Sequence, residues 1–406
     1  MLTLLNFFMA TINGYKTLAF ITSHPIQYQS PFFRALAADS RINLEVFFCH
    51  KASAEEQAHA GFGVEFEWDT PLFDGYSYRF LRNVASRPSI AEFQGMDTPE
   101  IRGIIARECF DAVMINGWHY KSAWQAMLAC WKTNTPVMVR SDSHLHTERS
   151  ALKRVGKWPL YRWFVSKLDA CLPVGTWSSE YFFHYGATED RVFIVPHAID
   201  IEYFQSESNR LESGRSQLRA KWGLSGGAVV FLFAGKFIHK KRPLDFVNAI
   251  GEAKSLGAEV EGLMVGDGAL RVACEELAKE KNLPIRFAGF LNQSEITSAY
   301  VAADALVLPS DGGETWGLVV NEAMACGVPC FVSDRVGCGP DMIRTPETGA
   351  IFPLGDTKTL GQILTDFAAS KERIGWMSER AREKAQHYTL DVAVDCTIKA
   401  IAAVSR

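Results

Sequence analysis

Short apolar runs alternate with segments of helical period along most of the chain, and no other feature constrains the fold as strongly. Such alternation builds parallel β-sheets with helices packed on both faces. Residues 228–234 are apolar throughout, as expected of a strand that is buried on both sides. The sequence therefore predicts an α/β protein.

The predicted elements form two groups. In the first half we predict strands at Thr17–Thr22, Asn43–Phe48, Ala112–Ile115, Pro136–Arg140, Ala170–Val174 and Val192–Val195, and helices at Pro31–Ala38, Pro99–Glu108 and Ser122–Trp131. In the second half we predict strands at Ala228–Ala234, Gly262–Val265, Ile285–Phe287, Ala305–Leu308 and Val328–Val332, and helices at Leu244–Lys254, Leu270–Lys281 and Glu295–Ala303, with helix from Thr357 to the end.

A polar stretch separates the two groups. Residues 205–217 lack an apolar period, and Gly226 and Gly227 follow, which favours a linker. A length of 406 residues suits two domains. We predict an N-terminal extension (1–14), an N-terminal domain (15–205), a linker (206–227), a C-terminal domain (228–385) and a last helix that packs back on the N-terminal domain (386–406).

Charge and cysteine content exclude several classes of protein. The formal net charge of −4 gives no basic field for nucleic acid. The nine cysteines are odd in number and form no Cys-x-x-Cys pair, which argues against a disulfide framework or a zinc site and favours the cytoplasm. The apolar residues 1–12 are too few to span a bilayer and lack the basic start of a signal peptide.

Two strand ends of the second half carry groups suited to phosphate. Gly235 and Lys236 open a loop with four cations, and backbone amides and cations can hold a diphosphate there. A solvated basic loop is the alternative. The run 265–269 contains half of a dinucleotide-binding fingerprint, but Arg271 stands where the third glycine belongs, and a tight turn is the simpler interpretation.

A third strand end, within residues 305–329, is the most informative. A glycine-rich loop follows Ser310, and a helix is predicted from near Thr315, whose free amides would face an anion. Glu314 and Glu322 stand eight positions apart, which is about 12 Å along a helix. One carboxylate can then bind the hydroxyls of a sugar and the other those of a ribose, with phosphates between them. A dipole-stabilised Glu and an unrelated polar Glu are the alternative.

This segment resembles the Glu-x7-Glu signature of glycosyltransferase family 4, a group of retaining enzymes. Residues 235–241 resemble the family's Gly-Arg/Lys…Lys segment, and residues 195–200 resemble more loosely the run that closes its first domain. The resemblance implies the GT-B fold: two doubly wound, parallel-sheet, Rossmann-like domains that face each other across a cleft. In such sheets ligands bind beyond the carboxyl ends of the strands.

The resemblance also implies roles for individual residues. Lys236 and Lys241 would bind the diphosphate of the donor, Glu314 its sugar and Glu322 its ribose. The donor-binding set is Gly235, Lys236, Lys241, Phe290, Glu314, Thr315, Trp316, Gly317, Leu318 and Glu322. The catalytic set is Asp142, Lys241 and Glu314; Asp142 takes the place where relatives carry a His or Asp facing the anomeric carbon.

Polar strand ends of the first half predict the acceptor side. The predicted residues are His24, Gln27, Tyr28, Trp118 and His144. The loop at 23–31 has no glycine, unlike the glycine-rich loop of the family. A polar loop and a helix N-cap at Asp142 are the alternatives. The spacing of His144 and His146 is common by chance and does not indicate a metal.

The predicted function is retaining transfer of a hexose from a nucleoside-diphosphate sugar, UDP rather than GDP, to a glycan or lipid-linked acceptor, as in polysaccharide biosynthesis. We predict no metal and no cofactor, because Asp-x-Asp is absent. A GT-B nucleotide-sugar epimerase and a non-catalytic nucleotide-sugar-binding protein are the alternatives; a nicotinamide-dependent oxidoreductase fits poorly.

The basic and aromatic residues of 149–164 suggest contact with the inner face of a membrane or, alternatively, an amphipathic helix on the core.

Overall fold

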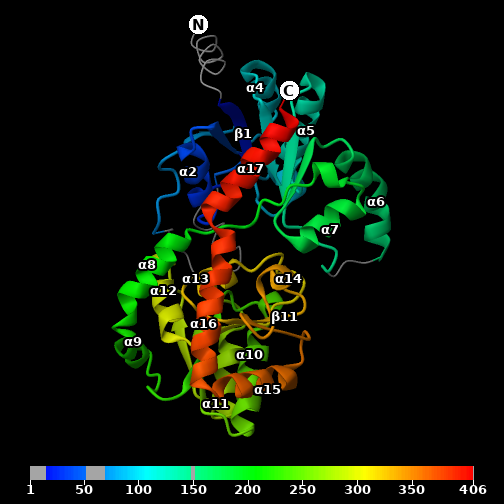
Figure 1. The fold of residues 1–406 in the computed structure, drawn as a ribbon. Helices are drawn as coiled ribbons and strands as arrows, with labels where there is room; N and C mark the ends of the chain where they lie inside the picture. Colours follow the sequence, from blue (N-terminus) through cyan, green and yellow to red (C-terminus); the bar gives the residue numbers. More distant parts are fainter. Residues whose placement is uncertain (1–14, 52–68, 148–150, 406) are drawn as a thin grey trace.

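The computed structural model describes residues 15–51, 69–147 and 151–405, without the side chains of 151–154. They form two α/β domains stacked end to end, and the chain's last helix returns to the first domain (Figure 1). The predicted fold class is confirmed. The proposed extension at 1–14 lies outside the described residues.

The first domain contains a six-stranded parallel sheet in the order β3-β2-β1-β4-β5-β6. Its strands are β1 (Lys16–Thr22), β2 (Ile42–Phe48), β3 (Ser77–Phe80), β4 (Ala112–Asn116), β5 (Val137–Ser141) and β6 (Ala170–Pro173). Its helices are α2 (Ser30–Ala38), α4 (Ile101–Glu108), α5 (Lys121–Thr133), α6 (Ala151–Val165) and α7 (Thr176–His184).

The second domain contains a parallel sheet in the order β12-β11-β10-β7-β8-β9. Its strands are β7 (Val229–Ala234), β8 (Val260–Val265), β9 (Ile285–Gly289), β10 (Ala305–Leu308), β11 (Cys330–Ser333) and β12 (Gly349–Phe352). Its helices are α8 (Ile201–Glu212), α9 (Arg215–Lys221), α10 (Pro243–Ser255), α11 (Arg271–Glu280), α12 (Gln293–Ala302), α13 (Leu318–Ala325), α14 (Gly339–Met342), α15 (Thr357–Ala368) and α16 (Lys371–Ala385).

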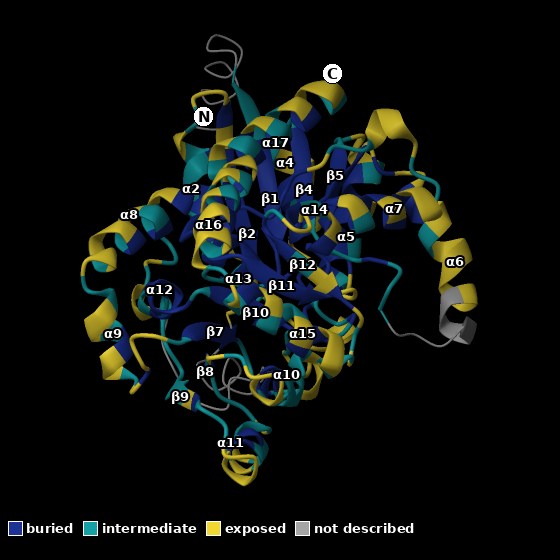
Figure 2. Ribbon diagram, turned by 60° about the horizontal axis from the view of Figure 1, so that its bottom comes forward, coloured by how far each residue is buried: buried dark blue, intermediate teal, exposed yellow. Residues whose placement is uncertain are grey.

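Both sheets share one topology. Counted from its own first strand, each domain has the Rossmann order 3-2-1-4-5-6. The order reverses between β1 and β4 in the first sheet and between β7 and β10 in the second. Ligands of such sheets bind at that switch point, outside the carboxyl ends of the strands. The inner strands of both sheets are buried while the helices keep exposed outer faces (Figure 2).

Three short segments differ from the predictions. Residues 192–195 do not form a strand, although Phe193 N and Val195 N donate to the carbonyls of Cys171 and Pro173 in β6. Pro173 has no N–H and cannot return a hydrogen bond, so a ladder does not develop. The edge strands β3 and β12 were missed, because they have only four residues each and are partly exposed.

The segment 206–227, which the sequence predicts to be a linker, is largely helical. Helices α8 and α9 cover most of it. The apolar period is missing because α9 is fixed by two arginines rather than by apolar side chains. Arg219 is the buried residue of this helix.

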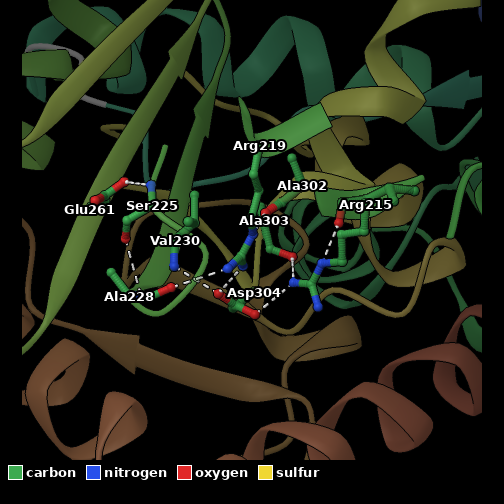
Figure 3. Close-up of polar contacts among 10 residues, drawn as sticks. Arg215, Arg219, Ser225, Ala228, Val230, Glu261, Ala302, Ala303 and Asp304 are labelled. Atoms are coloured by element: carbon green, nitrogen blue, oxygen red, sulfur yellow. Dashed lines mark hydrogen bonds and ion pairs between the residues drawn. The ribbon is translucent and has the colours of Figure 1, made fainter. Parts of the chain in front are cut away.

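The two arginines bind the carboxylate of Asp304, which directly precedes β10 (Figure 3). Arg215 Nη2 and Arg219 Nη2 each lie 2.7 Å from one carboxylate oxygen, and Val230 N of β7 donates to Asp304 at 2.7 Å. The same arginines donate to the carbonyls of residues 301–303 and 228. One carboxylate therefore ties the segment between the domains to both central strands of the second sheet.

The last two helices run from one domain to the other (Figure 1). Helix α16 packs against α13 of the second domain, and α17 (Leu390–Val404) packs against α2 of the first. Ala393, Val394, Ala400 and Ile401 are buried in the core of the first domain. The chain thus crosses between the domains twice.

We predict that Asp304→Ala lowers the free energy of unfolding by about 3 kcal/mol, because it leaves buried charges and a backbone amide without their partner. Chemical denaturation followed by circular dichroism measures the change. Glu207→Ala removes the exposed ion pair with Arg210 and is the matched control, with a loss below about 1 kcal/mol. Equal losses in the two variants would contradict the role of Asp304.

Candidate functional site

Two cavities open at the carboxyl ends of the strands. The larger has a volume of 890 Å³ and is lined by the first domain, including residues after β1, β4 and β5. The smaller, of 280 Å³, lies between the domains and is lined by residues of both. Ile26 and Tyr28, from the loop after β1, line both cavities. A molecule in one cavity can therefore meet a molecule in the other at this loop.

The smaller cavity brings together most of the predicted donor side chains. Its lining includes Gly235, Lys236, Lys241, Phe290, Leu318 and Glu322. The loops that carry them follow β7, β9 and β10, so the switch point of the second sheet forms one wall. Glu314, Thr315, Trp316 and Gly317 do not line this cavity, although Glu314 contacts it through Lys241.

A close approach of two backbones shapes the wall at β7. Gly266 has φ +127°, and a Cβ there would lie 2.0 Å from the carbonyl oxygen of Gly235. Only glycine fits such a contact. The sequence 265–269 is therefore a tight turn that lets the loop after β8 reach the loop after β7.

The loops after β7 and β10 are tied to each other by lysines. Lys241 Nζ pairs with the carboxylate of Glu314, and Asp311 N donates to the Lys240 carbonyl at 2.8 Å. Burial raises the pKa of Glu314, but attraction and hydrogen bonding to Lys241 outweigh burial and hold that pKa below its ordinary value. Glu314 is therefore ionised near neutral pH.

Lys236 differs from Lys241 in its surroundings. Burial, together with repulsion from Lys240 and Lys241, lowers the pKa of Lys236 to about 8, against a smaller opposite effect of Glu314. Three ammonium groups around one carboxylate leave an excess of positive charge. An anion in the cavity would relieve this repulsion and stabilise the charged form of Lys236.

Glu322 lines the smaller cavity, as does Asp267, and none of the ion pairs among the described residues includes Glu322. The Tyr300 hydroxyl donates to its Oε2 at 2.6 Å. Burial raises the pKa of Glu322 to about 7, although the hydrogen bond from Tyr300 and the charge of Lys241 act in the opposite direction. The carboxylate can thus gain a proton near neutral pH, and it can accept hydrogen bonds from hydroxyl groups when ionised.

Helix α13 begins at Leu318, not near Thr315, which corrects the predicted geometry. Gly317 has φ +104°, and the backbone before it bonds elsewhere: Gly337 N donates to the Glu314 carbonyl and Cys338 N to that of Trp316. Glu314 therefore lies in a loop before the helix, and the spacing of about 12 Å along a helix does not apply to it. The amides at the helix start still border the cavity at Leu318.

The predicted acceptor-side residues separate into three groups. His24, Tyr28 and Trp118 line the larger cavity, together with Asp142 of the predicted catalytic set. Gln27 lines the smaller one instead, where its side chain bonds to that of Gln293.

His144 lines neither cavity, contrary to the sequence prediction. It is buried, with its ring centre 5.4 Å from that of Trp177. Its aromatic surface is covered by protein, which removes it from the acceptor side.

Asp142 contacts the other domain. The Thr315 hydroxyl donates to Asp142 Oδ2 at 2.6 Å, so the loop after β5 and the loop after β10 meet across the cleft. The sequence also allows a helix N-cap at Asp142, but in the structure its carboxylate accepts the hydrogen bond from Thr315 of the other domain. Asp341 makes a second such contact, with the backbone and hydroxyl of Thr176.

A junction of aromatic and basic groups was missed from the sequence. The ring of His197 lies 5.9 Å from Tyr28 and 5.7 Å from Trp316, between centroids, and Asn321 Nδ2 donates to the His197 carbonyl at 3.2 Å. Burial and the nearby Arg140 lower the pKa of His197 well below its ordinary value. The sequence signal for this junction is Arg140, a charged residue in the otherwise apolar strand β5.

Two family models match the chain. Residues 31–198 match the model described as "Glycosyl transferase 4-like domain", and residues 214–386 match "Glycosyl transferases group 1". Together they cover most of both domains.

Curated relatives match over part of the chain. An N-acetyl-alpha-D-glucosaminyl L-malate synthase of Bacillus anthracis is 32% identical over 170 residues, 41% of this chain and 43% of that protein. A D-inositol 3-phosphate glycosyltransferase of Saccharomonospora viridis is 31% identical over 234 residues, 54% of this chain and 52% of that protein. The chain thus spans about half the length of the curated relatives it matches.

Solved structures resemble the whole fold. Anabaena Alr3699/HepE in complex with UDP has a TM-score of 0.72 at 15% identity, covering 95% of this chain and 99% of that one. A glycosyltransferase from Rickettsia africae ESF-5 has a TM-score of 0.72 at 15% identity, covering 96% and 98%. These likenesses and the two sheets confirm the GT-B fold.

We predict that Glu322→Gln becomes more stable relative to the natural protein as pH rises from 5 to 8. Glu322 has a raised pKa in the folded state, so its contribution to stability is lost between its ordinary pKa and about 7. Glutamine keeps the acceptor for Tyr300 and carries no charge. Denaturation at several pH values measures the difference in unfolding free energy.

Glu314→Gln is the matched control, because the pKa of Glu314 is lowered. Its contribution to stability is complete above the ordinary pKa of a glutamate and is lost only as pH falls below that value, so between pH 5 and 8 this variant should stay behind the natural protein by a constant amount. If the unfolding free energies of the two variants changed with pH in the same way, the raised pKa of Glu322 and the lowered pKa of Glu314 would be contradicted.

Proposed function

We propose that this chain, which has the GT-B fold and matches a glycosyltransferase family model in each domain, transfers a hexose from a nucleoside-diphosphate sugar to an acceptor with retention of configuration. One observation carries the proposal. The smaller cavity combines clustered lysines with the carboxylate of Glu322 and joins the larger cavity at Tyr28.

The donor occupies the smaller cavity in this proposal. Lys236 and Lys241 bind its diphosphate, and Glu322 accepts hydrogen bonds from the ribose. Phe290 lies where the base would bind. Glu314 contacts the transferred sugar from the loop that Lys241 holds in place. UDP is the preferred nucleotide, since the structurally similar Alr3699/HepE is in complex with UDP.

The reaction takes place where the two cavities meet. The glycosidic C–O bond to the diphosphate breaks, and an acceptor hydroxyl attacks the anomeric carbon from the side of the departing phosphate. That phosphate takes the acceptor's proton, so the new bond forms with the old configuration. Lys236 and Lys241 stabilise the charge that grows on the leaving oxygen, which replaces a metal in the proposal. Asp142 and Tyr28 orient the acceptor from the larger cavity.

The names of relatives give acceptors of different kinds. One contains malate, another D-inositol 3-phosphate, and a third, from Streptomyces kanamyceticus, is a 2-deoxystreptamine glucosyltransferase. We propose a glycan or lipid-linked acceptor for this chain. The larger cavity is rich in aromatic side chains, among them Trp118 and Tyr161, which suit the apolar faces of sugars.

We further propose contact with the inner face of a membrane, through helix α6. Val155, Trp158, Leu160 and Trp163 are each more than two fifths exposed on this helix, and Figure 2 shows it at the rim of the first domain. Lys157, Arg162 and Lys167 lie over aromatic rings of the same surface. Exposed apolar and aromatic groups flanked by cations suit an anionic lipid surface.

Helix α6 also borders the larger cavity, which Lys157, Leu160 and Tyr161 help to line. A membrane-bound acceptor would therefore enter beside the surface that binds lipid. Among the described residues, no helix combines the length and apolarity needed to cross a bilayer. The residues 149–150 of the proposed contact lie outside the described part.

We predict that the protein transfers labelled hexose from a UDP-sugar to an acceptor in a glycan panel, and that Lys241→Met lowers kcat/KM about 100-fold or more, because it removes charge from the leaving group. Product analysis by mass spectrometry measures transfer. Lys279→Met, on the exposed side of α11, is the matched loss of charge and should leave the rate unchanged. Epimerised donor without transfer, or binding of donor without any turnover, would overturn the proposal.

We predict that the protein sediments with vesicles containing phosphatidylglycerol and not with pure phosphatidylcholine. Trp158→Ser combined with Trp163→Ser should release it, because these rings would enter the lipid interface. Trp376→Ser removes an equally exposed tryptophan from the second domain and should leave binding intact. Sedimentation that is the same for both lipids, or unchanged in the double variant, would contradict the contact.

A further inference from the structure

Arg140 is a buried cation in the larger cavity without a carboxylate partner. It lies in β5, is 5% exposed and belongs to the cavity lining. None of the ion pairs among the described residues includes it. Taking an unpaired charge out of water costs several kcal/mol, so such a group is retained where another interaction stabilises it.

The guanidinium group uses few of its donors. It has five N–H groups, and its hydrogen bonds both come from Nη2: one to the Pro196 carbonyl at 3.2 Å and one to His197 Nδ1 at 3.3 Å. Nε is buried and has no partner. Its remaining contact is with the ring of Phe32, 5.7 Å away. Most of the hydrogen-bonding capacity of Arg140 is therefore unused.

The charges around the cavity do not neutralise Arg140. Burial lowers its pKa to about 10, more than Tyr28 and Asp142 raise it, and it stays charged at neutral pH. Asp142 is already bonded to Thr315 of the other domain. Lys157 adds a second positive charge at the cavity.

Two of the three histidines that line this cavity, His119 and His197, add no charge to it. Burial lowers the pKa of His119, against a smaller effect of Asp142, and that of His197 is lowered further. Both rings are neutral at pH 7. Arg140 and Lys157 thus face one carboxylate, and the cavity has room for an anion of considerable size.

We propose that the acceptor carries a negatively charged group, a phosphate or a carboxylate, which binds to Arg140 in the larger cavity. The inference rests on the proposed function, which makes this cavity the acceptor site. The planar fork of an arginine matches both kinds of oxyanion. An anion held at Arg140 lies beside His197, whose ring is 5.9 Å from that of Tyr28, so it fixes the acceptor next to the place where the donor sugar arrives. The charge therefore selects which hydroxyl is glycosylated.

The competing explanation is that Arg140 only supports the turn at 196–197. If Arg140 has only this structural role, its loss lowers donor hydrolysis and transfer to every acceptor alike, because His197 also touches Tyr28 and Trp316. If Arg140 binds the anionic group of the acceptor, its loss lowers transfer to charged acceptors alone. Selectivity between matched acceptors therefore distinguishes the two explanations.

The first experiment measures anion binding by calorimetry. The protein is saturated with UDP, which blocks Lys236 and Lys241, and is titrated with inorganic phosphate and, separately, with malonate. Binding is expected in the natural protein and in Arg107→Met, an exposed arginine on α4 that serves as the control. Arg140→Met should abolish it, and Arg140→Lys should retain a part. No binding of either anion to the UDP-saturated natural protein would overturn the proposal.

The second experiment compares acceptors that differ only in charge: glucose with glucose 6-phosphate and with glucuronate, and glycerol with glycerol 3-phosphate. The natural protein should prefer the charged members, and Arg140→Met should reduce that preference about 10- to 100-fold, as for the loss of a charge-assisted hydrogen bond. The exposed control Arg107→Met should keep both the preference for charged acceptors and the rate of donor hydrolysis of the natural protein. Comparing the phosphate acceptors with glucuronate shows whether the site prefers a phosphate or a carboxylate.

The outcomes separate this inference from the proposed function. Transfer to neutral and charged acceptors with equal kcat/KM leaves glycosyl transfer intact and overturns the anion site. If Arg140→Met lowers donor hydrolysis and transfer to every acceptor by the same factor, Arg140 has only a structural role, and the anion site is again overturned. Absence of any transfer by the natural protein contradicts the proposed function, while phosphate binding to the UDP-saturated protein still decides on Arg140.

Discussion

The carboxylate of Asp304 holds together the part of the molecule on which the site depends. It binds the two arginines of α9 and the backbone of β7, and it directly precedes β10. These two strands are neighbours at the switch point of the second sheet, and their other ends carry Lys236, Lys241 and Glu314. The same carboxylate fixes the helices that connect the domains. The lysine-rich wall and α9 are therefore held at opposite ends of the same two strands.

The two walls of the cleft are joined by contacts that neither domain makes alone. His197 lies between Tyr28 and Trp316, and Asp142 receives the Thr315 hydroxyl. Both contacts involve groups at the border of the two cavities. The loop after β10 and the strand that holds Arg140 are thereby coupled through direct side-chain contacts. A change of domain angle would alter both cavities together.

The sequence allowed the two sheets to be predicted, because buried parallel strands are apolar runs and their period is local. It also identified the lysines and Glu322, whose residue types suit phosphate and ribose. It failed where structure depends on distant partners. The backbone at 314–316 bonds to 337–338, so the helix starts late. The segment 206–227 is helical because its arginines find Asp304 about 90 residues away. His144 could not be excluded from the acceptor side until Trp177 was seen to cover it.

Helix α17 has a consequence for how the protein is made. Its side chains complete the core of the first domain, yet it is the last element of the chain. During synthesis the first domain leaves the ribosome with the face of α2 uncovered, and it stays so while the whole second domain is produced. Domains usually fold in the order of synthesis, from the N-terminus. Here α17 is made only after the whole second domain, so the apolar side chains of the first domain that pack against Ile401 stay uncovered until then.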